Sequence, residues 1–190
     1  MAQPPSDDEK LLRDLAKGNL AAFNACYERY QRAIYRFAWH MSANQAIAEE
    51  VTQEVFLHLI SKPRNYDAGK GPLAGYLLGM ARNLLRRQLA SLRNDVPLVE
   101  EILELEGSEF AGECDILSDL EHQEKLEYLQ KCILALPVEY REALVLCDLQ
   151  EMSYSDASAA LDCQPGTIAS RLHRARAMLK MRLKEIGCVR

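Results

Sequence analysis

The sequence predicts an all-α protein built from two small helical domains that are joined by an acidic linker. Apolar residues recur along most of the chain at alternating steps of three and four, which is the spacing of a helix face rather than of a strand. Proline, glycine and helix-capping residues divide this pattern into segments of helical length. The chain has 190 residues, which is room for one ordinary domain or two small ones.

The linker is predicted from the distribution of charge. Residues 1–93 carry 13 basic and 9 acidic residues, whereas residues 94–124 carry 11 acidic residues and no Lys or Arg. We therefore expect an N-terminal block (1–93), a linker (94–117) and a C-terminal block (118–190). The simplest interpretation of the acidic run is a solvated, self-repelling linker. Alternatively, it occupies a basic channel of a partner or shields the basic helices of its own chain.

Four helices are expected in the N-terminal block. The first contains Leu11, Leu12 and Leu15 and stops at Gly18. The third begins after a capping Asn44 and ends before Pro63, and the fourth begins at Pro72 after a loop. The second carries an apolar stripe that consists of Leu20, Phe23, Tyr27, Tyr30, Ile34, Phe37 and Met41.

The C-terminal block ends in a predicted helix-turn-helix. Two earlier helices are separated by Pro137, and Ser153 then caps a short helix, Tyr154 to Leu161. A break of about three residues separates it from a last helix, which starts at Pro165 and runs to about Glu185.

The last helix has one apolar and one basic face. From Gly166 to Lys184 it contains six Lys/Arg and no acidic residue. Such a face is often only solvated, but after a short helix and a tight break it predicts a recognition helix that binds duplex DNA. The candidate contacts are Thr167, Ser170, Arg171, His173, Arg174 and Arg176. The buried stripe is predicted to be Ile168, Leu172, Ala175, Leu179 and Leu183.

The fourth helix carries a second basic cluster with aromatic residues nearby. Rings stack on unpaired bases while cations follow the backbone, so this combination suits single-stranded nucleic acid. Tyr66 lies in the loop and is the better candidate for contact with an extruded base, whereas Tyr76 is alternatively a core residue. The cluster consists of Arg82, Asn83, Arg86 and Arg87.

The third helix exposes a run of carboxylates and amides, namely Glu49, Glu50, Gln53 and Glu54. Such a face is solvated, binds another protein, or performs acid-base or metal chemistry. The chain has no P-loop, GxGxxG, GxSxG or HExxH pattern, so no enzyme, cofactor or metal site is predicted.

Compartment is predicted from cysteine usage and hydropathy. The six cysteines are scattered without a CxxC pair, which indicates free thiols in a reducing cytoplasm. No apolar run approaches the roughly 20 residues of a membrane span.

Three segments carry a family resemblance. AEEVTQEVFLHLI, GYLLGMARNLLRRQL and LPVEYREALVLCDLQEMSYSDASAALDCQPGTIASRLHRARAMLKMRL together resemble the bacterial sigma-70 family, in its extracytoplasmic-function (ECF) group. They occur in the family's order and spacing. The sequence departs from the family pattern at Ile47, where a polar residue is usual, and at Tyr76, where tryptophan is usual.

The resemblance implies a non-enzymatic transcription initiation factor. It implies that the third helix binds the beta-prime clamp of core RNA polymerase, that the C-terminal block rests on the beta flap, and that an anti-sigma factor is a partner. The polymerase-binding set is then Glu49, Glu50, Gln53, Glu54 and Leu57. The minus-10 DNA set is Tyr66, Tyr76, Arg82, Asn83, Arg86 and Arg87. The minus-35 DNA set is Thr167, Ser170, Arg171, His173, Arg174 and Arg176.

Two other classes stay open on the residues alone. A dimeric helix-turn-helix regulator with an N-terminal sensor bundle would bind palindromic duplex without polymerase. An enzyme of unfamiliar type would use His40, His58 or Cys26.

Overall fold

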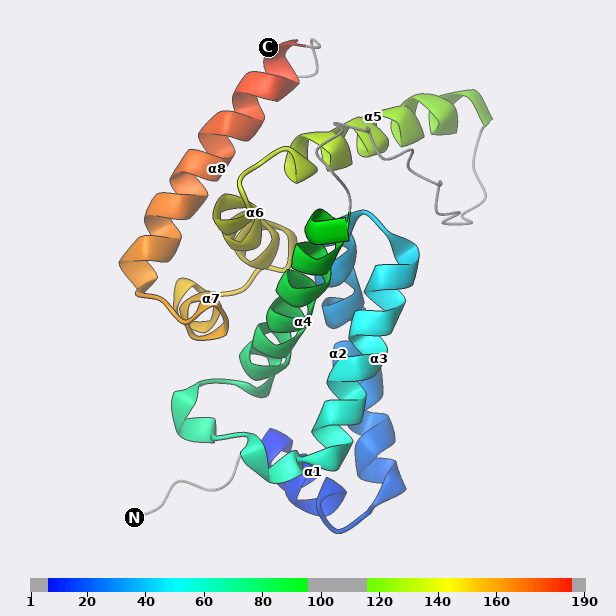
Figure 1. The fold of residues 1–190 in the computed structure, drawn as a ribbon, viewed down its shortest axis with the longest axis vertical. Helices are drawn as coiled ribbons and strands as arrows, with labels where there is room; N and C mark the ends of the chain where they lie inside the picture. Colours follow the sequence, from blue (N-terminus) through cyan, green and yellow to red (C-terminus); the bar gives the residue numbers. More distant parts are fainter. Residues whose placement is uncertain (1–6, 96–115, 186–190) are drawn as a thin grey trace.

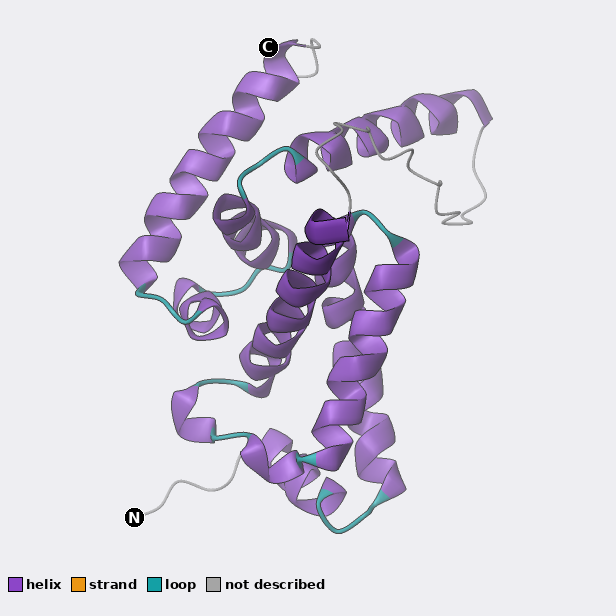
Figure 2. Ribbon diagram, in the orientation of Figure 1, coloured by secondary structure: helices purple, strands orange, loops and turns teal. Residues whose placement is uncertain are grey.

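The computed structural model describes residues 7–95 and 116–185. Within these ranges every regular element is helical and no strand occurs (Figure 2). The predicted all-α class is thereby confirmed. The predicted linker, 94–117, lies almost entirely outside the described residues, so its boundaries stay a prediction.

Helices α1 (Asp7–Leu15), α2 (Leu20–Ser42), α3 (Gln45–Ser61) and α4 (Leu73–Asp95) form the N-terminal block (Figure 1). Asn44 caps α3 as predicted, because its side-chain oxygen accepts a hydrogen bond from the Ile47 amide at 3.0 Å. The connection between α3 and α4 is more regular than the predicted loop. It contains two 3-10 turns, η1 (Pro63–Asn65) and η2 (Ala68–Lys70).

The C-terminal block consists of α5 (Ile116–Leu134), α6 (Val138–Leu144), α7 (Tyr154–Leu161) and α8 (Pro165–Glu185). Ser153 caps α7 as predicted, since its Oγ accepts a hydrogen bond from the Asp156 amide at 3.1 Å. Asp162 then adopts a left-handed conformation with φ of 51°, which ends α7. Helix α6 continues into a π-helical turn, η3 (Val145–Leu149), whose wider winding was not predicted.

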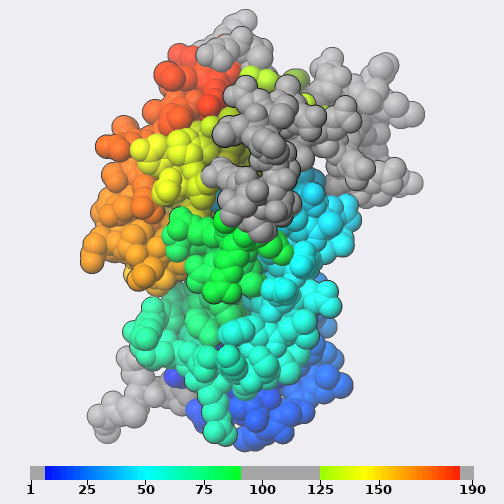
Figure 3. Space-filling view, viewed as in Figure 1, coloured from blue at the N-terminus to red at the C-terminus, as the bar shows by residue number. Residues whose placement is uncertain are grey.

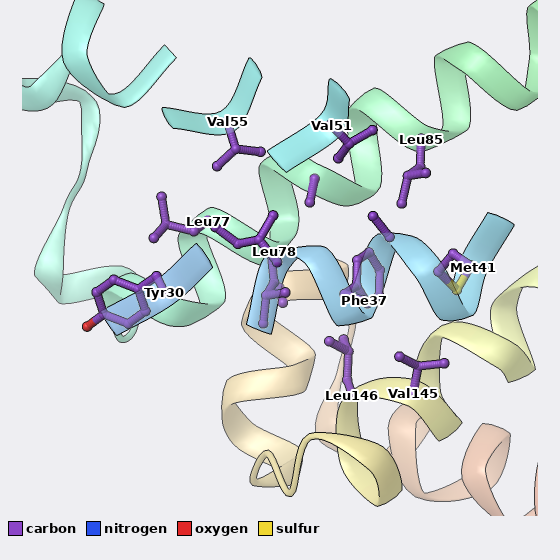
Figure 4. Packing of buried hydrophobic residues seen from close by; sticks show 14 of the residues in the cluster. Tyr30, Phe37, Met41, Val51, Val55, Leu77, Leu78, Leu85, Val145 and Leu146 are labelled. Atoms are coloured by element: carbon purple, nitrogen blue, oxygen red, sulfur yellow. The ribbon is translucent and has the colours of Figure 1, made fainter. Parts of the chain in front are cut away.

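The two blocks share one apolar core. Helix α2 lies at its centre, with α3 and α4 on one side and α6 on the other (Figure 4). Phe37 of α2 is fully buried and lies beside Leu146 of the C-terminal block, which is also fully buried. Because one helix supplies both halves of the core, the blocks pack as one body among the described residues.

The apolar stripe of α2 is buried from Tyr30 onward, Phe23 is half-buried against the core, and the N-terminal end of the stripe is exposed. Leu20 is 71% exposed and Tyr27 is 37% exposed. Leu20 is the first residue of its helix, at the end of the bundle. Tyr27 stands against Phe56 of α3, with ring centroids 4.8 Å apart, at the edge of an open groove.

Candidate nucleic-acid interface

Helix α8 presents a polar face to solvent, as the sequence predicts. Ile168, Leu172 and Ala175 are buried against the rest of the block, while Leu179 and Leu183 are half-buried. On the opposite face Ser170, His173 and Arg174 are exposed, and Thr167 and Arg171 are half-buried. Helix α8 lies at the outside of the molecule, next to the short helix α7 (Figure 1). This face is therefore open to a duplex.

Two arginines of α8 are held by partners on α6 and η3. Arg174 Nη1 donates to the Tyr140 hydroxyl at 3.2 Å, and this bond raises the pKa of Arg174. Arg176 donates to both oxygens of Asp148, at 2.9 Å and 2.5 Å, which raises the pKa of Arg176. Arg174 is thus hydrogen-bonded to a neutral hydroxyl, whereas Arg176 is paired with a carboxylate.

The predicted basic cluster of α4 divides into two faces. Asn83 and Arg87 are exposed. Arg82 and Arg86, one turn apart, instead point at Glu142 of α6, with distances of 2.9 Å and 3.0 Å from their Nε atoms to Glu142 Oε1. Glu142 is 0% exposed. The sequence places these four residues together, but the structure leaves Asn83, Arg86 and Arg87 exposed and half-buries Arg82 against Glu142.

Tyr66 and Tyr76 lie together, with ring centroids 5.7 Å apart. Both rings are half-buried, and burial raises the pKa of each phenol. The Tyr66 hydroxyl donates to the Gly71 carbonyl at 3.0 Å, which fixes the loop before α4. Tyr76 is therefore both a partner of Tyr66 and a packing residue at the surface of the core.

Tyr66 also lines a pocket of about 350 Å³ between α1 and the 3-10 turns. Arg13, Lys17 and Arg64 line this pocket together with one carboxylate, Glu9. Sequence reasoning missed these three cations, because Arg13 comes from α1, Lys17 from the turn after α1 and Arg64 from η1. The nearest signal in the sequence is Lys17, which directly precedes the turn residue Gly18.

The polar residues of α3 border a groove of about 840 Å³ between α2 and α3. Glu49, Gln53 and Leu57 line it, and Leu57 is 57% exposed. Glu50 and Glu54 are exposed on α3 but do not line the groove. The predicted set thus forms one exposed surface of which only part borders the groove.

No catalytic arrangement is seen in the described residues around His40, His58 or Cys26, the residues that an enzyme of unfamiliar type would use. His40 is half-buried and bonded to Gln130, His58 is exposed, and Cys26 is buried with a pKa raised by burial. Among the described residues no group of three His, Cys, Asp or Glu could hold a metal ion. Nor is any helix in the described ranges long and apolar enough to cross a membrane.

Family models match both blocks. Sigma-70 region 2 matches residues 26–94, and Sigma-70 region 4 matches residues 126–179. The ECF RNA polymerase sigma factor SigC of Mycobacterium tuberculosis is 31% identical over 179 residues, which cover 93% of this chain and 92% of SigC. The chain belongs to the ECF sigma factors of the sigma-70 family.

Other comparisons agree on the family of this sigma factor. The ECF RNA polymerase sigma factor SigE of Mycolicibacterium smegmatis is 33% identical over 148 residues, and the chain spans 56% of its length. A co-crystal structure of the sigma factor RpoE with the anti-sigma factor NepR from Bartonella quintana has a TM-score of 0.68 and 25% identity. The match covers 87% of this chain and 98% of that one.

Within the sigma factor, α2 to α4 correspond to the region 2 match and most of α5 to α8 to the region 4 match. Sequence reasoning missed the two buried charged residues that join these regions, Arg141 and Glu142. They directly precede an apolar run, Ala143 to Cys147, and charged residues beside such a run need partners if they are buried.

Proposed function

We propose that this sigma factor directs promoter-specific initiation by docking core RNA polymerase on α3, capturing the minus-10 element on α4 and reading the minus-35 element with α8. The observation that carries the proposal is the face of α8. Ser170, His173 and Arg174 are exposed together on a helix that follows a tight turn after a short helix.

The minus-35 element is read as duplex. The base edges in the major groove are contacted from the N-terminal half of α8, by Thr167, Ser170, Arg171 and Arg174. His173 and Arg176 flank them and supply backbone contacts. The bond from Arg174 to Tyr140 supports this role, because a neutral phenol orients the guanidinium without neutralising it.

The minus-10 element is captured as an opened strand. Asn83 and Arg87 offer an exposed amide and cation, and Tyr66 lines a pocket that also contains three cations and Glu9. Binding of unpaired bases to such a surface offsets the few kcal/mol of the unpairing cost. The surface is completed by Arg82, Arg86 and Tyr76 once the side of α4 that faces the C-terminal block is released from it.

Core polymerase binds the exposed surface of α3, through Glu49, Glu50, Gln53, Glu54 and Leu57. The support is chemical: exposed Leu57 lies beside a groove lined by both apolar and polar side chains, and this composition favours a protein interface over a solvated helix. The C-terminal block rests on the beta flap. The protein acts in the cytoplasm by binding and positioning, without covalent catalysis.

An anti-sigma factor is a second protein partner. RpoE of Bartonella quintana has been solved in complex with the anti-sigma factor NepR, and this chain is similar to RpoE over most of both chains. We infer an equivalent partner here that competes with core polymerase.

Run-off transcription tests the proposal. Purified core RNA polymerase is supplied with genomic fragments, including the region upstream of the gene for this protein, with and without the chain. Specific transcripts that appear only with the chain are expected, and mapping their starts defines both elements. If polymerase is active with a known sigma factor but silent with this chain, the proposal fails. Tight binding of a dimer to palindromic duplex without polymerase would then favour the dimeric regulator.

A further inference from the structure

Hydrogen bonds as well as the shared apolar core hold the two blocks together. Arg141 Nη1 donates to the Met41 carbonyl at 2.7 Å, and Gln150 Nε2 donates to the Ala33 carbonyl at 2.9 Å. Each of these bonds joins α2 to the C-terminal block. They hold the blocks in one defined arrangement, which Figure 3 shows as a continuous body with α4 in green beside the C-terminal block in yellow and orange.

The Glu142 carboxylate accepts hydrogen bonds from two arginines of α4, as a DNA phosphate would. Its Oε1 accepts from the Nε atoms of Arg82 and Arg86, and its Oε2 accepts from Arg86 Nη2 at 3.2 Å. A carboxylate and a phosphate present the same pair of anionic acceptors to a guanidinium fork. While Glu142 is in place, its carboxylate engages both guanidinium groups; the Arg82 side chain is 14% exposed and that of Arg86 is 43% exposed.

Helix α4 also touches α7 closely along a glycine face. A Cβ atom built on Gly79 would lie 3.2 Å from the Ala160 carbonyl oxygen, and one on Gly75 would lie 3.5 Å from the Asp156 carbonyl oxygen. The distance at Gly75 is an ordinary van der Waals contact, but at Gly79 a Cβ atom would force the Ala160 backbone to shift by a few tenths of an ångström. The contact is therefore tightest at Gly79, and it places α4, the proposed minus-10 helix, against α7, the helix that precedes α8.

This arrangement cannot contact both promoter elements. Positions −10 and −35 are about 25 base pairs apart, which is roughly 85 Å of duplex at 3.4 Å per base pair. In the structure α4 lies against α7, the short helix immediately before α8. The blocks must separate before α4 and α8 can bind their elements at the same time.

We propose that Glu142 and the contact of α4 with α7 form an internal lock that keeps Arg82 and Arg86 from DNA until core polymerase holds the blocks apart. The inference rests on the proposed function, because it assigns these arginines to the minus-10 strand. Only molecules in the open state bind DNA by these arginines. The apparent affinity of the free protein is therefore the affinity of the open state multiplied by the fraction of molecules that are open.

Two variants open the lock by different means. Glu142→Gln removes the charge that holds Arg82 and Arg86, and Glu139→Gln, at an exposed position of the same helix, is its control. Gly79→Leu pushes α4 away from α7 without changing any charge. Its control is Ala90→Leu at an exposed position of α4. Circular dichroism selects variants that keep their helices, so the lock stays testable if one of the two fails to fold.

The readouts are the radius of gyration by small-angle scattering and the affinity for a fluorescein-labelled single-stranded oligonucleotide of mixed sequence, both without polymerase. Glu142→Gln and Gly79→Leu are expected to expand the protein and tighten DNA binding by about tenfold. Both controls should match the wild type. Adding Arg82→Ala and Arg86→Ala to Glu142→Gln should abolish the gain in affinity while the expansion remains.

The lock is wrong if folded variants keep the wild-type radius, or if they expand without binding DNA more tightly. Failure of the proposed function looks different, since it is silence of the wild-type chain in run-off transcription. A chain that is active with polymerase, but whose two variants neither expand nor gain affinity, is a sigma factor without this lock.

Discussion

His40 Nδ1 donates a hydrogen bond to Gln130 Oε1 at 2.8 Å, across 90 residues of chain. The bond joins the last part of α2 to α5 and therefore joins the two blocks. Gln130 is buried beneath it, and its Nε2 atom donates to the Trp39 carbonyl at 3.4 Å. A titratable ring thus lies within the contact between the blocks.

Acid is expected to weaken this contact. Burial lowers the pKa of His40, the Gln130 bond opposes that shift, and the charge of Arg36 adds to it. In the unfolded chain His40 has the ordinary histidine pKa of about 6.5. As the pH falls below that value, the unfolded state binds more protons than the folded state, so the free energy of unfolding decreases.

Urea denaturation at about pH 7.5 and about pH 5.5 measures this loss. His40→Gln should reduce it, whereas His58→Gln, at an exposed position of α3, should retain it. An equal loss in both variants would assign the pH dependence to other groups.

Leu57→Asp should abolish binding to core polymerase while leaving the fold intact. The side chain is 57% exposed at the groove between α2 and α3, so a carboxylate there costs little in the free protein but is desolvated in an interface. Leu20→Asp is the matched control, because Leu20 is 71% exposed and lies outside the groove. Co-purification with core polymerase distinguishes them, and equal loss from both variants would remove the groove from the polymerase surface.

Arg174→Ala should weaken binding to a minus-35 duplex by about 1–3 kcal/mol and relax its sequence preference, which is the effect of losing a base contact. Lys180→Ala, two turns further along α8, should weaken all duplexes alike and reduce the salt dependence. Fluorescence anisotropy on specific and scrambled duplexes measures both. If Arg174→Ala also weakened every sequence equally, it would be a phosphate contact.

Asp148→Asn should tighten duplex binding. The substitution releases Arg176, whose guanidinium donates to both Asp148 oxygens, and it removes a negative charge beside α8. One additional phosphate contact would steepen the dependence of affinity on salt by about 0.9 in the log-log slope. Glu151→Gln removes an exposed charge nearby without releasing an arginine and is the control. A slope that stays unchanged in Asp148→Asn would show that Arg176 does not reach DNA.

Leu146→Ala should cost about 2–5 kcal/mol of the free energy of unfolding, because it empties a fully buried site beside Phe37. Leu126→Ala, at a side chain that is 58% exposed, should change it by less than about 0.5 kcal/mol. Thermal or urea denaturation measures both variants. A small effect of Leu146→Ala would mean that the site between the blocks can collapse.

Local features of the fold could be predicted because they depend on neighbouring residues. The caps at Asn44 and Ser153 and the bounds of α7 follow from side chains within one turn. The buried stripe of α8 follows from its spacing. The bounds of η3 could not be predicted, because a π-helical turn has no comparable spacing rule.

The contact between the blocks could not be predicted, because it depends on residues far apart in sequence. Arg82 and Glu142 are separated by 60 residues, and nothing in the pattern of α4 shows that its basic side faces protein rather than solvent. The sequence therefore groups Arg82 with Asn83, although the fold turns them to different surroundings. The pocket at Tyr66 was missed for the same reason, since Arg13 reaches it from another helix.

Arg141 connects the ends of two helices from different blocks. Its guanidinium donates to the Met41 carbonyl near the end of α2 and to the Leu134 and Leu136 carbonyls at the end of α5. Unfolding of either helix end would remove hydrogen-bond acceptors from the buried Arg141 guanidinium. Local unfolding of one end alone is therefore costly in free energy. The free chain should therefore melt in a single calorimetric transition, with the van't Hoff enthalpy equal to the measured one, although it contains two family regions.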